Sequence, residues 1–441
     1  MAALPSFPWL PRRGRGAWCR TALSQAVSLQ DAVDGVVRDL AGAGDAHLAL
    51  VFASSSYASD LPRLLPLLRR RLRADHWLGC IGGGVVGTEP GGTARELEQE
   101  PALSVTLLHL PGASLQPFAL DGADLPDLDG PADPWVQLVG QAPSADQSML
   151  VLVDPTCTAI NDLISGLDFA YPEALKVGGL AGQHSAPHGS LLFDDRVLTG
   201  AIGCVIGGAW SLQSVVAQGC RPIGPVFEVE QARRNVVLEL SRGSRRNTPV
   251  AALQAILSDL SPAEREQVKH SLFLGVGPND FRLSGAGDDS AEAGESSGFL
   301  VRNLIGVDPR NGAVAVAERM RVGQKVQFQL RDGGASRDES RLLLQRQARR
   351  SPQPLTALLF ACLGRGQGLY GRKDGDVSLA REAFATTPIA GVFCSGEIGP
   401  VGGSTHLHGY TASWGFLVPR TAAAPEAAAA GASSVPPASR P

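Results

Sequence analysis

Short apolar runs alternate with amphipathic stretches along this chain. Residues 47–55, HLALVFASS, form an apolar run that ends in small polar residues, which predicts a buried strand. Asp60 then precedes a leucine-rich stretch at helical spacing, and residues 76–87, HWLGCIGGGVVG, predict a second short strand. A strand, a helix and a strand within roughly 40 residues have the size of a βαβ unit.

The same order of elements occurs twice more. Residues 149–183 and 354–399 each contain an apolar run, a helix-like stretch and a second apolar run that carries glycines. Hairpin-like segments follow all three copies. We therefore predict an internal repeat, with chance similarity of short apolar runs as the alternative. The alignment matches Cys80 with Gly179 and Cys394 and, three residues later, Gly83 with Gly182 and Glu397.

The pattern changes near residue 225. Residues 247–260 and 261–272 predict two helices, the second with a Ser261/Glu264 capping box, and strand-like pieces follow. The acidic stretch 285–298 predicts a mobile loop. The expected fold class is α/β (mixed α+β), with two domains built from strand-helix-strand units and β-hairpins. We place a flexible leader at 1–22, an N-terminal domain at 23–225, a C-terminal domain at 226–419 and a low-complexity tail at 420–441.

Composition argues against several classes of partner. The net charge of −4 comes without a basic stripe, so we expect no nucleic-acid binding. No apolar run approaches the ~20 residues of a membrane span, so we expect no membrane partner. The seven cysteines form no CxxC pair, which predicts reduced thiols and a cytoplasmic location. Arg12, Arg13, Arg15 and Arg20 precede the first acid, Asp31, which leaves an organellar transit peptide as the alternative.

Most of the candidate chemistry lies in residues 391–411, GVFCSGEIGPVGGSTHLHGYT. This stretch carries the thiol of Cys394, the carboxylate of Glu397 and the imidazoles of His406 and His408. The two imidazoles would face the same side of a strand. The loops after the two parallel strands of a βαβ unit lie at one edge of the sheet. Residues 362–368 are therefore expected beside residues 394–399.

Arg365 and Glu397 suggest the class of ligand. Arg365 would bind a carboxylate while Glu397 accepts an ammonium, and the neighbouring glycines would expose backbone N–H groups to an anion. This arrangement suits an amino acid or a related zwitterion. The predicted ligand-binding residues are Cys362, Gly364, Arg365, Gly366, Cys394, Gly396, Glu397 and His408.

Other interpretations of these residues stay open at this point. Arg365 and Glu397 could pair with each other and only hold two loops together. Cys394 with His408 and Glu397 could form the catalytic group of a hydrolase or acyltransferase. The histidines and thiols could bind a metal, but the close cysteine pairs typical of zinc sites are missing. We assign no catalytic residue, no metal and no cofactor.

Several of these motifs resemble the FIST family. The resemblance lies in VFCSGEIGP, LHGYTAS, CLGRG, LGCIGGGVVG and VGGLAG, and it extends over about residues 23–419. It implies an N-terminal and a C-terminal FIST domain that bind small ligands in intracellular signal transduction. No kinase, chemoreceptor, cyclase or F-box module is visible, so we expect a stand-alone sensor with a separate, unknown downstream partner. An adaptor that binds only proteins is the second alternative.

Overall fold

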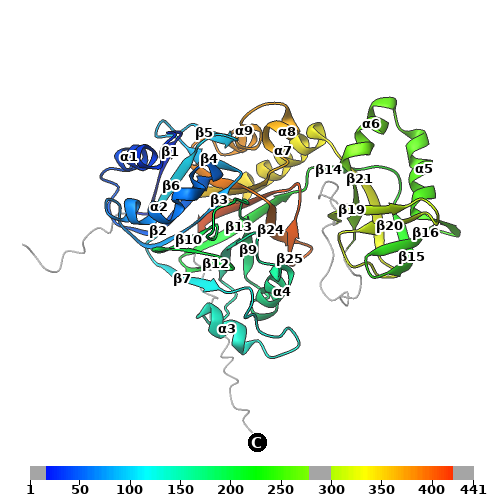
Figure 1. Cartoon of the computed structure of the whole chain (residues 1–441), viewed down its shortest axis with the longest axis horizontal. Helices are drawn as coiled ribbons and strands as arrows, with labels where there is room; N and C mark the ends of the chain where they lie inside the picture. Colours follow the sequence, from blue (N-terminus) through cyan, green and yellow to red (C-terminus); the bar gives the residue numbers. More distant parts are fainter. Residues whose placement is uncertain (1–15, 278–298, 421–441) are drawn as a thin grey trace, which may run out of the picture.

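The computed structural model describes residues 16–277 and 299–420. The predictions for residues 1–15, for the acidic insertion at 285–298 and for the tail beyond residue 420 lie outside this part of the chain. The described residues form a large mixed α/β body and a smaller barrel beside it (Figure 1). The predicted fold class is confirmed.

Three strand-helix-strand units form the body, as the repeat predicts. In each unit a buried apolar strand is followed by a helical segment and by a second strand parallel to the first. The first unit has β2 (Ala46–Ser54), α2 (Leu61–Arg69) and β3 (Ala74–Gly82). The second has β8 (Ser148–Val153), α4 (Ile160–Ala170) and β9 (Leu175–Leu180). The third has β22 (Thr356–Cys362), α8 (Gly366–Tyr370), α9 (Gly375–Ala383) and β23 (Ile389–Cys394).

Each unit ends with a strand that returns antiparallel beside its first strand and pairs with one further strand. The returning strands are β6 (Leu103–His109), β12 (Ala201–Gly208) and β26 (Ala412–Pro419). Their outer partners are β1 (Trp18–Ser24), β7 (Ala113–Leu120) and β13 (Trp210–Ala217). Because β1 begins at Trp18, the last residues of the leader predicted at 1–22 lie in a strand. Helices α1 (Leu29–Asp39) and α3 (Asp133–Val139) complete the body.

The three units exchange hairpins in a cycle. The hairpin of the first unit, β4 (Gly84–Thr88) and β5 (Ala94–Glu98), pairs with β23 of the third unit. The hairpin of the second, β10 (Leu191–Phe193) and β11 (Arg196–Leu198), pairs with β3 of the first. The hairpin of the third, β24 (Gly396–Val401) and β25 (Ser404–His408), pairs with β9 of the second. Each sheet is therefore completed by another unit, and the body folds as one piece.

Backbone hydrogen bonds join the units where their second strands end. Gly83 donates to the carbonyl of Phe393, Gly182 to that of Ile81, and Ser395 to that of Leu180. These equivalent bonds place Cys80 in register with Gly179 and Val392. The alignment drawn from the sequence is therefore two residues out in the third unit: Cys394 corresponds to Gly82 and Ala181, and Glu397 to Val85 rather than to Gly83. Short glycine-rich runs slide easily against one another, which explains the error.

A small barrel is inserted between the second and third units. Its ring runs β21-β15-β16-β20-β19-β18 and closes by pairing β18 with β21. The strands are β14 (Cys220–Pro222), β15 (Phe227–Arg233), β16 (Val236–Arg242), β17 (Arg245–Asn247), β18 (Leu272–Val276), β19 (Leu300–Asp308), β20 (Ala313–Val316) and β21 (Lys325–Arg331). Helices α5 (Pro249–Asp259) and α6 (Pro262–Ser271) pack on it, and α6 begins with the predicted Ser261/Glu264 capping box.

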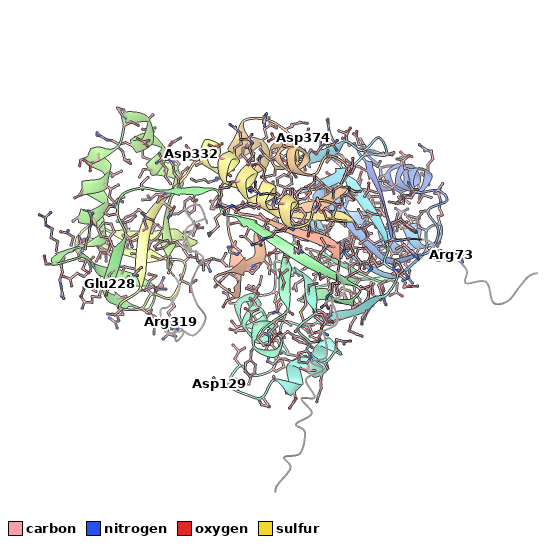
Figure 2. All side chains as sticks on the ribbon, turned by 180° about the vertical axis from the view of Figure 1, so that it is seen from behind. Arg73, Asp129, Glu228, Arg319, Asp332 and Asp374 are labelled. Carbon is pink, nitrogen blue, oxygen red and sulfur yellow. The ribbon has the colours of Figure 1, made fainter. Side chains whose placement is uncertain are left out.

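The chain leaves the barrel near Asp332, whose side chain caps α7 (Gly333–Arg350) at the top of the junction (Figure 2). It then enters the third unit of the body. Residues 226–419, predicted as one domain, thus contain both the barrel and a unit that completes the sheets of the other two. Composition revealed the start of the barrel near residue 225, whereas its end carries no comparable change.

Candidate ligand-binding site

Arg365 is fully buried and bound by protein groups. Its guanidinium donates to both carboxylate oxygens of Asp376, at 2.8 and 2.7 Å, and to the hydroxyl of Tyr370 at 2.6 Å. A third nitrogen donates to the carbonyl of Tyr410 at 3.3 Å. The ion-pair partner of Arg365 is therefore Asp376 on α9 and not Glu397. The sequence offered no signal for this choice, because Asp376 looks like an ordinary residue of the first helical turn.

A carboxylate from another unit fills the glycine-rich loop after β22. The backbone N–H of Gln367 donates to Glu98 Oε1 at 2.8 Å, and a Cβ added to Gly366 would lie 2.3 Å from the same oxygen. The carbonyl of the other loop glycine, Gly364, accepts a hydrogen bond from Arg331. The predicted anion-binding loop thus holds the protein's own Glu98, which the exchanged hairpin β4–β5 carries there.

The thiols of Cys362 and Cys394 lie side by side, as the sequence predicts. The two residues are register partners at the ends of parallel strands β22 and β23. Burial raises the pKa of Cys362 to about 11 and raises the pKa of Cys394 well above its usual range. Both side chains are therefore thiols at neutral pH, the less nucleophilic form.

Glu397 joins this group without a charged partner in contact. Its Oε2 accepts the backbone N–H of Thr411 at 3.0 Å, and the thiol of Cys362 lies beside the carboxyl. Burial raises the pKa of Glu397 well above its usual range and so favours the neutral carboxyl. In the first unit the matching N–H, of Ala102, donates to the hydroxyl of Ser54. Glu397 therefore has a structural role that a hydroxyl fills elsewhere.

His408 lies directly opposite Glu397 in the β24–β25 hairpin and is 3% exposed. Its Nε2 lies 3.0 Å from the carbonyl oxygen of Gly399, whereas its buried Nδ1 has no partner among the described residues. Burial lowers the pKa of His408 to about 3, so the ring is neutral. Because a carbonyl can only accept, Nε2 carries the proton and Nδ1 is a bare acceptor.

His408 also lines a pocket of about 720 Å³ between the body and the barrel, which we call the interdomain pocket. The body side is formed by α4, β25 and the start of β24, and the barrel side by β19, β20 and the loop after β20 (Figure 1). Arg319 lies on the side of the barrel turned toward the body (Figure 2). The polar lining residues are Asn161, Ser165, Ser395, Thr405, His406 and His408 from the body, and Asn235, Arg302, Asn303, Glu318 and Arg319 from the barrel.

The charges of the interdomain pocket lie on one wall. Among the described lining residues, only Arg302, Glu318 and Arg319 are charged, and all three belong to the barrel. Arg302 donates to Glu318 at 2.8 Å and to the carbonyl of Leu407 in the body at 2.8 Å. The guanidinium of Arg319 makes no hydrogen bond or ion pair with another described residue. Opposite charges thus stand side by side, with Arg319 available to an anion.

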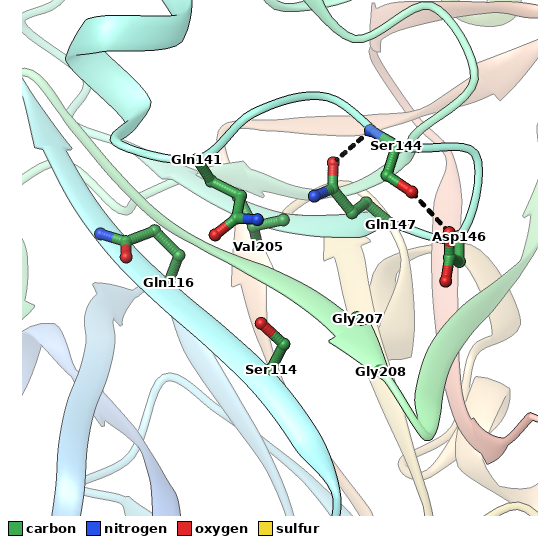
Figure 3. A pocket seen from close by; sticks show the side chains of 9 residues that line it. All are labelled: Ser114, Gln116, Gln141, Ser144, Asp146, Gln147, Val205, Gly207 and Gly208. Carbon is green, nitrogen blue, oxygen red and sulfur yellow. Dashed lines mark hydrogen bonds between the residues drawn. The ribbon is translucent and has the colours of Figure 1, made fainter.

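A second, smaller pocket of about 170 Å³ lies on the outer face of β7 and β12 (Figure 3). Its polar groups are largely bound to each other: Ser144 donates from its N–H to Gln147 and from its hydroxyl to Asp146. Asp146 also pairs with Arg420. These contacts stabilise a turn, so the interdomain pocket is the better candidate site.

Sequence reasoning missed the barrel wall of the site. The barrel wall is formed by charged residues from a strand-like segment that carries no motif: Arg302, Glu318 and Arg319. This segment lies more than eighty residues before His406 and His408 in the sequence. Their only signal is a cluster of charges around two short strands. No group of three or more His, Cys, Asp or Glu residues in the described ranges is arranged to hold a metal ion. Nor is any described helix long and apolar enough to cross a membrane.

The fold and the pocket define a two-part α/β protein with a ligand-sized cavity at the junction of its parts. Residues 47–242 match the FIST N domain and residues 252–400 match the FIST C domain, so the chain belongs to the FIST family. FIST domains are associated with small-ligand binding in signalling.

The similar proteins carry little functional information. An uncharacterized protein of Mycobacterium tuberculosis is 35% identical over 386 residues, which cover 86% of this chain and 93% of that protein. An uncharacterized protein of Mycobacterium bovis is 31% identical over 405 residues, covering 91% of this chain and 97% of that protein. A crystal structure of cyanuric acid hydrolase from A. caulinodans aligns with a TM-score of 0.32 and 10% identity, over 92% of this chain and 100% of that one.

Proposed function

We propose that this protein is an intracellular sensor that binds an amino acid or a related zwitterion and signals through a separate partner. The observation that carries the proposal is the interdomain pocket. Its volume of about 720 Å³ suits a small molecule, and such sites occur preferentially at domain junctions. The free cysteines support the cytoplasmic location expected from the sequence.

The charged wall of the pocket matches the two charges of a zwitterion. Glu318 would accept hydrogen bonds from the ammonium group, and Arg319 would bind the carboxylate. Arg302 holds Glu318 in place and also contacts the body through Leu407. A ligand that touches both walls favours the arrangement in which body and barrel stand together, which gives the sensor a way to transmit occupancy.

The predicted ligand set shares only His408 with this pocket. Binding by Cys362, Gly364, Arg365, Gly366, Cys394, Gly396 and Glu397 stays a prediction, and we do not include these residues in the proposed site. Protonated thiols do not favour the alternative of a cysteine-dependent hydrolase or acyltransferase.

Thermal unfolding in the presence of each of the twenty L-amino acids tests the proposal. We expect at least one to raise the melting temperature of the wild type, because a ligand that binds only the folded state stabilises it. Glu318→Gln and Arg319→Ala should abolish that rise. Arg321→Ala, which removes a second exposed arginine of the same loop outside the pocket lining, should keep it.

Two results would contradict the proposal. If no amino acid stabilises the wild type, the alternative of an adaptor without a small ligand gains support. If the Arg319→Ala variant responds as fully as the wild type, the ligand binds elsewhere in the molecule.

A further inference from the structure

The body wall of the interdomain pocket differs chemically from the barrel wall. Its described polar residues offer hydroxyl, amide and imidazole groups and no Asp, Glu, Lys or Arg side chain. Burial lowers the pKa of His406, and it lowers the pKa of His408 to about 3, so both rings are neutral at physiological pH. The pocket therefore has one charged wall and one uncharged, hydrogen-bonding wall.

Buried groups behind this wall keep it uncharged. Burial raises the pKa of Glu397, directly opposite His408, and so favours its neutral form. Asp168 lies behind β25 on α4, but Lys176 pairs with it at 2.9 Å and Thr405 donates to it. The carboxylates nearest the wall are thus either protonated or paired.

His408 lines the uncharged wall and has one nitrogen without a described partner, Nδ1, which is buried in the free protein. His408 Nε2 donates to Gly399, which fixes the ring and leaves Nδ1 with a lone pair and no described partner. Leaving a buried acceptor unpaired costs free energy. A ligand that supplies an N–H or O–H at this point would recover that cost, whereas an apolar group would not.

We infer that the body wall is a subsite for an uncharged ligand side chain that carries a hydrogen-bond donor, a carboxamide or a hydroxyl, with His408 Nδ1 as its acceptor. This inference rests on the proposed function, since the barrel wall must hold the ammonium and carboxylate groups. An acidic side chain would meet Arg302, which Glu318 and the carbonyl of Leu407 already engage, and its carboxylate has no proton to donate to Nδ1. A purely apolar side chain would leave Nδ1 unpaired.

Two pairs of amino acids of matched shape test the inference by equilibrium binding to the full chain. L-threonine and L-valine differ by a hydroxyl in place of a methyl group, and L-glutamine and L-glutamate differ by an amide in place of a carboxylate. We expect the donor-bearing member of each pair to bind roughly tenfold more tightly, the effect of about one hydrogen bond. Between pH 5 and 8 the threonine preference should stay constant, because His408 stays neutral throughout.

Two substitutions of His408 separate its nitrogens. Gln can reach the carbonyl of Gly399 from the position of Nε2 but places no acceptor at Nδ1, so His408→Gln should bind threonine and valine equally. Asn places an oxygen at the position of Nδ1, so His408→Asn should keep the threonine preference even if its melting temperature falls.

The possible binding results distinguish a failure of the subsite from a failure of the proposed function. Equal binding within each pair by the wild type, or a preference that survives in His408→Gln, would overturn the subsite while leaving the proposed function intact. If none of the four amino acids binds and none of the other sixteen stabilises the protein, the proposed function fails, and the subsite fails with it.

Discussion

The group around Arg365, Cys394 and Glu397 and the interdomain pocket lie close together in the molecule, yet they differ in almost every physical respect. In the first group the guanidinium of Arg365 pairs with Asp376, and burial raises the pKa values of Cys394 and Glu397. In the second, charged and neutral polar groups line a cavity of about 720 Å³. Several kinds of reactive side chain in a short stretch of sequence therefore do not by themselves identify a binding site.

The exchange of hairpins explains why the group around Arg365, Cys394 and Glu397 is closed to solvent. We call it the sealed group. The β4–β5 hairpin brings Glu98 to the loop after β22, and β24 inserts Glu397 at a position where the first unit has the core residue Val85. The interdomain pocket escapes this closure because β25 is the last strand of its sheet and faces the barrel. Hydrogen-bonding groups at the edge of the body thus stay available, whereas those at its centre are used for folding.

The largest expected effect comes from breaking the buried ion pair. Arg365→Ala leaves Asp376 buried without its partner, and we expect the free energy of unfolding in denaturant to fall by about 3–5 kcal/mol. Arg341→Ala, which removes a surface pair with Glu382, is the control and should change it by less than about 1 kcal/mol. If the Arg365→Ala variant instead stays stable but no longer responds to amino acids, the ligand binds in the sealed group and not in the interdomain pocket.

A pH-dependent effect is expected at Glu96, another buried carboxyl near the sealed group. It accepts the backbone N–H groups of Gly375 and Val377, and burial, with the charge of Asp376, raises its pKa from 4.5 to about 8. The folded state therefore holds the proton more tightly than the unfolded state. The stability that this proton provides is complete below about pH 4.5 and is lost as the pH rises to about 8.

Glu96→Gln should remove this dependence. Relative to the wild type, the variant should gain stability steadily as the pH rises from 5 to 8, whatever its stability at pH 5, as measured by denaturant unfolding at several pH values. A constant difference between the two proteins across this range would show that Glu96 is ionised in the folded state.

The smallest effect is expected at Glu397. Burial favours the neutral carboxyl of Glu397, so Glu397→Gln, which keeps an oxygen for the N–H of Thr411, should change the free energy of unfolding by less than about 1 kcal/mol. Glu397→Ala leaves that N–H unpaired and should cost about 1–3 kcal/mol. If Gln proves as damaging as Ala at pH 7, the carboxyl is charged and the sealed group is less inert than the structure indicates.

The sequence predicted the fold better than the site. Periodicity revealed the three strand-helix-strand units, because a buried parallel strand reads as a continuous apolar run. It also placed Cys362 beside Cys394, since the ends of parallel strands meet. The partner of Arg365 and the occupation of the glycine loop by Glu98 depend on hairpin exchange and on barrel docking. The same is true of the pocket that Arg319 and His408 both line. Those long-range contacts leave no local pattern for a single sequence to reveal.

Hydrogen exchange with and without the most stabilising of the twenty L-amino acids shows where the bound ligand lies. If the ligand lies between body and barrel, protection should increase in both walls, in residues 300–308 and 313–319 of the barrel and in residues 404–409 of the body. Residues 362–366 and 375–383 should exchange as in the free protein. If protection increases only in residues 362–366 and 394–397 and the barrel is unchanged, the ligand does not bind between the body and the barrel.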